Sequence, residues 1–306
     1  MYTIQLGKCS LEVPTIAVGC MRITELDKKE AAKFLYGAIE LGANYFDHAD
    51  IYGAGQCETL FSEALNLNAS NREKLLIQSK SSIVPGKRFD FSKEYIIGSV
   101  EGILKRLGTD YLDVYLLHRP DALMEPEEVA EAFDQLEQSG KVRHFGVSNQ
   151  NPMQMELLKK CVKQPIVANQ VQFGPAHAGM ISQGLEVNML TPGSVNHDGS
   201  LMDYCHLHDI TIQPWSPFQY GYFEGVFLGS DKYVKLNNII NEIAEKYSVS
   251  ATTITVAWFL RHPAKLQPII GSTKLSRLEE ACKATEIRLT RQEWYDIYTA
   301  GGHILP

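Results

Sequence analysis

The sequence of 306 residues predicts an α/β protein, a (β/α)8 TIM barrel with an N-terminal β-hairpin and two extra helices. Short apolar runs alternate with longer amphipathic stretches along most of the chain, and each pair is typical of one βα unit. The apolar runs are continuous, as in residues 114–117, which is the pattern of parallel strands covered by helices. Eight such units close most simply into a barrel. No segment resembles a linker, so we expect a single domain over residues 1–306.

The elements are expected in the following order. A hairpin over residues 3–6 and 10–13 turns at Gly7 and Lys8. The eight barrel strands are expected at residues 15–19, 45–47, 75–80, 114–117, 142–148, 168–171, 211–215 and 267–271. The helices are expected at residues 27–41, 58–67, 92–107, 126–139, 152–160, 199–208, 235–247, 250–261 and 275–284. Two connections, residues 172–198 and 219–233, are too long for simple turns, and we expect them to form pocket walls.

Composition excludes several functional classes. The chain has 29 Lys and Arg against 36 Asp and Glu, a net charge of −7, which argues against nucleic acid as a partner. No stretch approaches the roughly 18 to 20 apolar residues that cross a bilayer, and the N-terminus has no signal-peptide pattern. The six cysteines lie far apart, without metal-binding spacing. We therefore expect a cytoplasmic protein with free thiols and no membrane partner.

Four polar residues follow neighbouring strands at the end where barrel active sites lie. Asp47 ends the second strand, Tyr52 follows in the next loop, Lys80 ends the third strand and His118 follows the fourth. Because the C-terminal ends of barrel strands meet around one small volume, we expect these side chains to converge.

Together these four side chains suit protonation of a carbonyl oxygen. A phenol such as Tyr52 titrates near 10 and is a poor acid at neutral pH unless a cation stabilises its phenolate. Lys80 supplies such a cation and is expected to lower the pKa of Tyr52, while Asp47 keeps the ammonium charged. A neutral His118 would orient the oxygen. No protein side chain supplies a hydride, so this chemistry implies a cofactor.

Further strand ends indicate where that cofactor lies. Ser148, Asn149 and Gln170 offer a hydroxyl and amides that suit a carboxamide. Trp215 offers an aromatic face on which a nicotinamide could stack. A hydroxyl-rich, basic helix start suits a phosphate and comprises Gly271, Ser272, Thr273, Lys274 and Arg277.

The sequence also resembles the aldo-keto reductase family. The segments that carry the resemblance are FDHADIYG, IQSK, LLHRPD, GKVRHFGVSN, ANQVQF, QPWSPFQYG and IIGSTKLSRLEE. The resemblance implies reduction of a small aldehyde or ketone by NADPH, with Asp47, Tyr52, Lys80 and His118 as catalytic residues and Tyr52 as general acid. It implies NADP contacts at Ser148, Asn149, Gln170, Trp215, Ser216, Phe218, Gly221, Gly271, Ser272, Thr273, Lys274, Arg277 and Glu280. Many members have a lysine where Gly271 stands, and Lys274 would supply that cation.

Several alternatives stay open at the level of sequence. An NADPH-binding sensor with little turnover would keep the same motifs. A metal-dependent barrel hydrolase could use the DHAD segment, residues 47–50, but further ligands are not evident and no metal is expected. Arg119 could contact an anionic substrate or fix its loop through a carboxylate. A small-molecule carbonyl compound is the expected partner, and the protein is expected to be a monomer or a weak homo-oligomer.

Overall fold

A computed structural model describes residues 1–306 and contains an eight-stranded parallel sheet in the order β11-β10-β9-β8-β5-β4-β3-β14. The strands are β3 (Ala17–Gly19), β4 (Tyr45–Asp47), β5 (Leu76–Ser81), β8 (Leu112–Leu117), β9 (Val142–Ser148), β10 (Ile166–Gln172), β11 (Thr211–Trp215) and β14 (Ile269–Ile270). The sheet closes beside β14, where the Ile212 amide donates to the Lys265 carbonyl at 3.0 Å and the Gln267 amide donates to the Ile212 carbonyl at 2.9 Å. The predicted (β/α)8 barrel is therefore confirmed.

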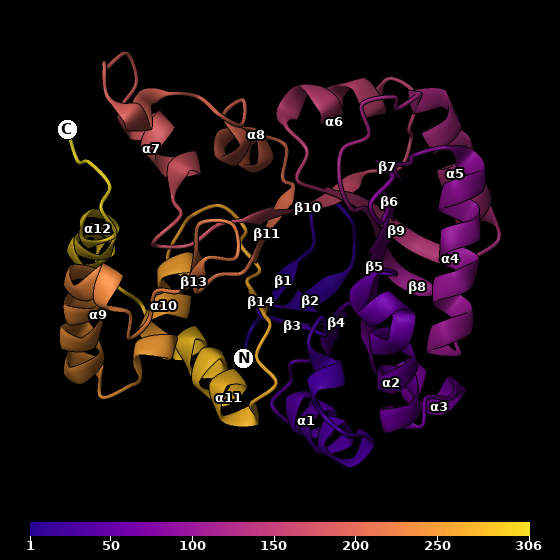
Figure 1. Cartoon of the computed structure of the whole chain (residues 1–306), viewed down its shortest axis with the longest axis horizontal. Coiled ribbons are helices and arrows are strands. Elements are labelled where there is room, and N and C mark those ends of the chain that lie inside the picture. Colours follow the sequence, from indigo (N-terminus) through magenta and orange to yellow (C-terminus); the bar gives the residue numbers. More distant parts are fainter.

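Eight helices follow the barrel strands and surround them (Figure 1). They are α1 (Lys28–Glu40), α2 (Gln56–Leu65), α4 (Lys93–Leu107), α5 (Pro126–Gln138), α6 (Pro152–Lys159), α8 (Leu201–Leu207), α10 (Ala251–Leu260) and α11 (Leu275–Lys283). Local sequence explains their ends: Asp27 and Glu30 form a capping box at the start of α1, and Gly108 ends α4 in a left-handed conformation.

The predicted N-terminal hairpin pairs β1 (Thr3–Gln5) with β2 (Glu12–Pro14) and covers the base of the barrel. Its Leu6 packs in a fully buried cluster with Tyr45 and Val167, which belong to the N-terminal halves of barrel strands. Gly7 is required in the turn because its φ is +56° and a Cβ there would lie 2.5 Å from the Val167 carbonyl oxygen. The opposite end of the barrel, where the strands end, stays open for a site.

Four helices lie outside the eight βα units, where two were expected: α3 (Ala69–Arg72), α7 (Gly179–Leu185), α9 (Val234–Tyr247) and α12 (Arg291–Ala300). The sequence contained a signal for α12, since Thr290 and Glu293 form a capping box before the buried residues Trp294 and Ile297. In contrast, α7 contains two glycines and lies in the connection over residues 172–198, for which no helix was expected.

Short elements complete the chain. Two small hairpins lie at the rim: β6 (Ile83–Val84) with β7 (Arg88–Phe89), and β12 (Gln219–Tyr220) with β13 (Gly225–Val226). Single 3-10 turns occur at Ile23–Glu25, Tyr52–Gly55, Pro192–Ser194, Asp231–Tyr233 and Ala284–Glu286. No helix in this structure has the length and apolar character needed to cross a membrane.

Candidate active site

A cleft of about 690 Å³ opens at the C-terminal ends of the barrel strands. Most of the predicted site residues line it: Asp47, Tyr52, His118, Ser148, Asn149, Gln170, Trp215, Ser216, Phe218, Gly271, Ser272, Lys274 and Arg277. The predicted residues outside this lining are Lys80, Gly221, Thr273 and Glu280. Residues that are far apart in the sequence thus share one cavity, as expected of strand ends in a barrel.

Asp47 and Lys80 form a buried ion pair beneath the cleft. The Lys80 ammonium donates to both Asp47 carboxylate oxygens and to the His48 carbonyl oxygen, each at 2.8 Å. Burial alone would lower the pKa of Lys80, but Asp47 and Tyr52 together hold that pKa above its ordinary value. The ammonium is therefore a fixed positive charge.

Two side-chain amides complete the surroundings of Asp47. Gln78 and Gln170 each donate from Nε2 to Asp47 Oδ1, at 2.6 and 2.9 Å. The Gln78 amide also donates to Gln213 Oε1 at 2.9 Å, which links the carboxylate to a chain of buried amides inside the barrel. Sequence reasoning missed Gln78 and Gln213, although each lies two residues before a predicted site residue and therefore on the same face of its strand.

Tyr52 and His118 lie together at one end of the cleft, with ring centroids 6.1 Å apart and an edge-on angle of 87°. The Lys80 ammonium lies 5.0 Å from the Tyr52 ring centroid. Burial raises the pKa of Tyr52, and the nearby Lys80 charge opposes this rise, so the predicted net lowering is not found in this structure. Burial also lowers the pKa of His118 far below its ordinary value, with Lys80 and Arg119 as further causes, so its imidazole is neutral.

The residues expected to contact a carboxamide are bonded to one another. Asn149 donates to Ser148 Oγ at 2.7 Å and accepts from the Trp215 indole at 3.2 Å. The Trp215 ring stacks on Phe223, with centroids 5.8 Å apart and planes 23° apart. Phe223 lies between β12 and β13, in the connection that was expected to form a pocket wall. Gln172 anchors this hairpin by donating to the Gly221 carbonyl oxygen.

The other end of the cleft is basic. Lys274 and Arg277 are exposed where β14 leads into α11, and both line the cavity. The Arg277 guanidinium donates to Thr252 Oγ1 at 2.7 Å, and Glu280 lies 3.9 Å from it. The Lys274 ammonium has no side-chain partner in this structure. Two cations beside the start of a helix can bind a phosphate group.

The DHAD segment does not form a metal site in this structure. Both Asp47 oxygens are occupied by the Lys80 ammonium, and no cluster of three His, Cys, Asp or Glu side chains is placed to hold an ion. His48 is fully buried against Phe61, and neither ring nitrogen has a hydrogen-bond partner. Burial and the Lys80 charge lower the pKa of His48 to about 3.

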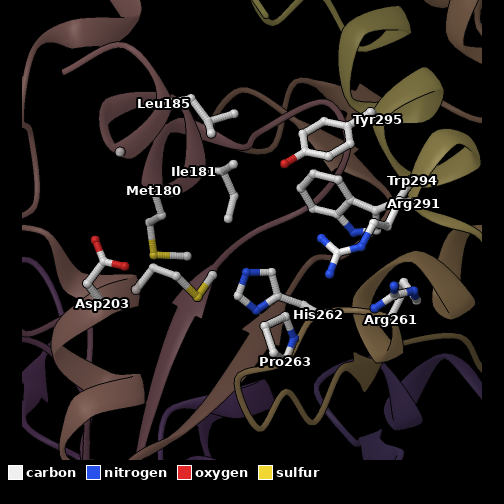
Figure 2. Close-up of a pocket in the computed structure, with 12 residues that line it drawn as sticks. Met180, Ile181, Leu185, Asp203, Arg261, His262, Pro263, Arg291, Trp294 and Tyr295 are labelled. Atoms are coloured by element: carbon white, nitrogen blue, oxygen red, sulfur yellow. The ribbon is translucent and has the colours of Figure 1, made fainter.

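A second cavity of about 320 Å³ lies away from these residues, between α7, α8 and α12. Figure 2 shows its walls, in which Met180, His262 and Trp294 face a common space. None of the predicted catalytic or cofactor residues contributes to it. The cleft at the strand ends is therefore the candidate active site.

Comparison with known proteins agrees with this geometry. The sequence model described as "Aldo/keto reductase family" matches residues 15–300. The chain belongs to this family. Among the aldo/keto reductase relatives, "Oxidoreductase YdhF" of Escherichia coli (strain K12) is 35% identical over 306 residues, with 96% of each chain covered. The "6-dehydroglucose reductase" of Novosphingobium aromaticivorans is 32% identical over 311 residues, with 99% of this chain and 96% of that protein covered.

Solved structures of aldo-keto reductases have the same fold. A thermostable aldo-keto reductase in complex with the inhibitor epalrestat aligns with a TM-score of 0.78 at 26% identity, covering 98% of this chain and all (100%) of that chain. The aldo-keto reductase of Bombyx mori in complex with NADP aligns with a TM-score of 0.73 at 23% identity, covering 99% of this chain and 94% of that chain. The fold assignment therefore rests on sequence and on structure.

Proposed function

We propose that this chain is an NADPH-dependent aldo-keto reductase that reduces a small aldehyde or ketone to the alcohol, with Tyr52 as general acid. One observation carries the proposal. The buried Lys80–Asp47 pair lies beside Tyr52, and Tyr52 and a neutral His118 open onto the same cleft. A proton donor, a cation and a hydrogen-bond donor that lie close together support protonation of a carbonyl oxygen.

The residues present fit NADPH. The cationic pair Lys274 and Arg277 suits the 2′-phosphate. The polar atoms at Ser148 and Asn149 suit the nicotinamide end, and they lie beside the Trp215 ring, on which Phe223 already stacks. Gln170 Oε1 accepts no hydrogen bond in the structure, so it can accept one from a carboxamide while Nε2 stays on Asp47. Bound NADPH would supply the hydride that no side chain can provide.

Protein side chains bind the carbonyl oxygen and supply the proton that it receives. His118 donates a hydrogen bond from a ring nitrogen to the carbonyl oxygen and orients it, which a neutral imidazole can do. Tyr52 gives its phenolic proton to the oxygen as the carbonyl carbon is reduced. Since burial raises the pKa of Tyr52, the phenolate that remains depends on Lys80 for its stabilisation. Asp47 in turn keeps Lys80 charged and aimed.

The decisive test is NADPH oxidation, followed by absorbance, with a panel of small aldehydes and ketones. Turnover with aldehydes, faster than with hindered ketones, supports the reductase. Tight NADPH binding without oxidation of any panel member would instead favour the sensor, and failure to bind NADPH would contradict both. Stoichiometric metal in the purified protein would revive the hydrolase.

Other expectations from the sequence stay predictions. They are one domain over residues 1–306, a cytoplasmic location, no nucleic-acid or membrane partner, and a monomer or weak homo-oligomer. Size-exclusion chromatography with light scattering tests the last of these directly.

A further inference from the structure

Arg119 directly follows His118, and its side chain has no structural role in its loop. We propose that Arg119 binds an anionic group of the substrate, so that the preferred substrate is a small aldehyde carrying a carboxylate or a phosphate. This inference rests on the proposed reductase activity and adds the chemical class of its substrate.

The loop that contains Arg119 is held by other groups. The Arg119 amide donates to the Ser82 hydroxyl at 2.9 Å, and that hydroxyl donates to the Arg119 carbonyl oxygen at 3.2 Å. Asp121, the nearest carboxylate along the chain, accepts from the amides of Phe91 and Leu123, each at 2.9 Å. The guanidinium takes part in no hydrogen bond or ion pair, so the alternative in which it fixes the loop through a carboxylate fails.

The guanidinium is instead held against an aromatic face of the cleft. It lies 5.7 Å from the centroid of the Trp215 ring, and the Trp215 indole is itself fixed by Asn149 at 3.2 Å. A cation over an aromatic ring keeps its charge, and the Arg119 N–H groups make no hydrogen bond in this structure, so they are free to donate to a ligand. Arg119, His118 and Tyr52 line the same cavity, so a substrate held at Tyr52 lies beside unused donors.

The charges around the cleft support an anion at this end. Asp47 is the single carboxylate in the lining, and Lys80 already neutralises it. The lining cations are Arg22, Arg119, Lys274 and Arg277. The last two lie at the phosphate end, and Arg22 pairs with Glu25 at 3.8 Å. Arg119 is therefore the unpaired cation at the catalytic end of a protein whose net charge is −7.

The experiment compares matched aldehydes with the NADPH-loaded enzyme. The pairs are 4-carboxybenzaldehyde with benzaldehyde, and glyceraldehyde 3-phosphate with glyceraldehyde. We expect kcat/KM to favour a charged member by about tenfold or more, and the two pairs distinguish carboxylate from phosphate. Arg119→Met should lower this preference by about 10- to 100-fold, mainly through KM, as expected for loss of a charge-assisted hydrogen bond. Arg119→Lys should retain part of the preference.

Two arginine variants serve as comparisons. Arg88→Met removes an exposed arginine bonded to Asp90 outside the cleft and should keep the wild-type preference. Arg22→Met removes another cation of the cleft lining. If wild type shows no preference for either charged aldehyde, or if the preference depends on Arg22 and persists in Arg119→Met, the proposal is wrong. An equal loss with charged and neutral aldehydes in Arg119→Met would also contradict it.

Failure of the reductase itself has a different signature, because none of the four aldehydes would then oxidise NADPH. In that case the dissociation constant of 4-carboxybenzaldehyde, measured by tryptophan fluorescence, still tests Arg119. We expect weaker binding to Arg119→Met than to wild type, with benzaldehyde as the reference. Equal binding would overturn the inference.

Discussion

Lys80 donates to both carboxylate oxygens of Asp47 at 2.8 Å, and the exposed fractions of the two side chains are 0% and 3%. A buried ion pair costs desolvation energy when it forms, and removal of one partner leaves the other as an uncompensated charge. Because the pair is almost fully buried, its electrostatic effect on the adjacent Tyr52 is weakly screened. The same contact therefore contributes to folding and to the proposed catalysis.

Asp47→Asn should damage both stability and turnover. The amide keeps the shape of the carboxylate but cannot neutralise Lys80, so we expect a loss of roughly 3–5 kcal/mol in the free energy of unfolding. Turnover should fall by at least about 100-fold, because Lys80 loses the partner that keeps it charged beside Tyr52. Urea unfolding and NADPH oxidation by the folded variant measure the two effects.

Asp113→Asn is the matched control. Asp113 is bonded to Arg72 at 2.7 Å in a second buried pair, near the start of β8 and away from the cleft. The Asp113→Asn variant should lose a free energy of unfolding comparable to that lost by Asp47→Asn, while its turnover per folded molecule stays unchanged. If both variants lost turnover equally, the effect of Asp47 would be one of folding alone.

Tyr52→Phe should remove turnover and leave binding intact. The Tyr52 hydroxyl interacts with the Lys80 ammonium, which keeps its bonds to Asp47 and to the His48 carbonyl in the variant, so loss of the hydroxyl leaves no buried charge unpaired. A general acid contributes about 10²- to 10⁴-fold to the rate, and we expect kcat to fall within that range. The dissociation constant of NADPH, from tryptophan fluorescence, should not change. Tyr36→Phe, which alters a hydroxyl bonded to Leu65 outside the cleft, is the control; equal kcat in the two variants would contradict the assigned role.

The candidate site could be located from the sequence because the barrel fold determines where the ends of its strands lie. Once Asp47 and Lys80 are assigned to strand ends, the parallel pairing of their strands brings them together, and this does not depend on the conformation of the loops. The apolar runs that predict the strands are local features, so residues 45–47 and 142–148 were predicted with the bounds that the structure has.

Other features depend on contacts between distant segments. The Gln170 side-chain amide donates to Asp47, which belongs to a different strand. The sequence around Gln170 does not indicate this hydrogen bond. The stacking of Phe223 on Trp215 likewise depends on how the β12–β13 hairpin folds back. The rise in the pKa of Tyr52 follows from burial. The types of the neighbouring residues indicate the opposing effect of Lys80 but do not show how deeply Tyr52 is buried.

Arg277→Met should weaken NADPH binding far more than NADH binding. Only NADPH carries the 2′-phosphate, and a charge-assisted hydrogen bond contributes about 1.5–3 kcal/mol, or roughly 10- to 100-fold in affinity. Fluorescence titration of both nucleotides gives the ratio of dissociation constants. Arg288→Met removes an exposed arginine that does not line the cleft and should keep the wild-type ratio. An unchanged ratio in Arg277→Met would place the phosphate elsewhere, with Lys274 as the next residue to replace.

His48→Leu should make the protein less sensitive to acid. Burial, with Lys80 as a second cause, lowers the pKa of His48 to about 3, against 6.5 for an ordinary histidine. Between these values the unfolded chain binds a proton that the folded chain does not, so stability falls as pH falls below about 6.5. The slope is about 1.4 kcal/mol per pH unit for one group, which amounts to about 2 kcal/mol between pH 6.5 and pH 5.

The leucine variant lacks this term, because its side chain does not titrate. Urea unfolding of wild type and His48→Leu at pH 7 and pH 5 should therefore show a smaller loss of stability in the variant, by about 2 kcal/mol. The comparison uses the difference between two proteins, so other titrating groups cancel. His197→Leu, which removes an exposed histidine, should follow the wild-type profile. Parallel profiles for wild type and His48→Leu would mean that water or a local opening reaches His48 and lets it protonate in the folded state.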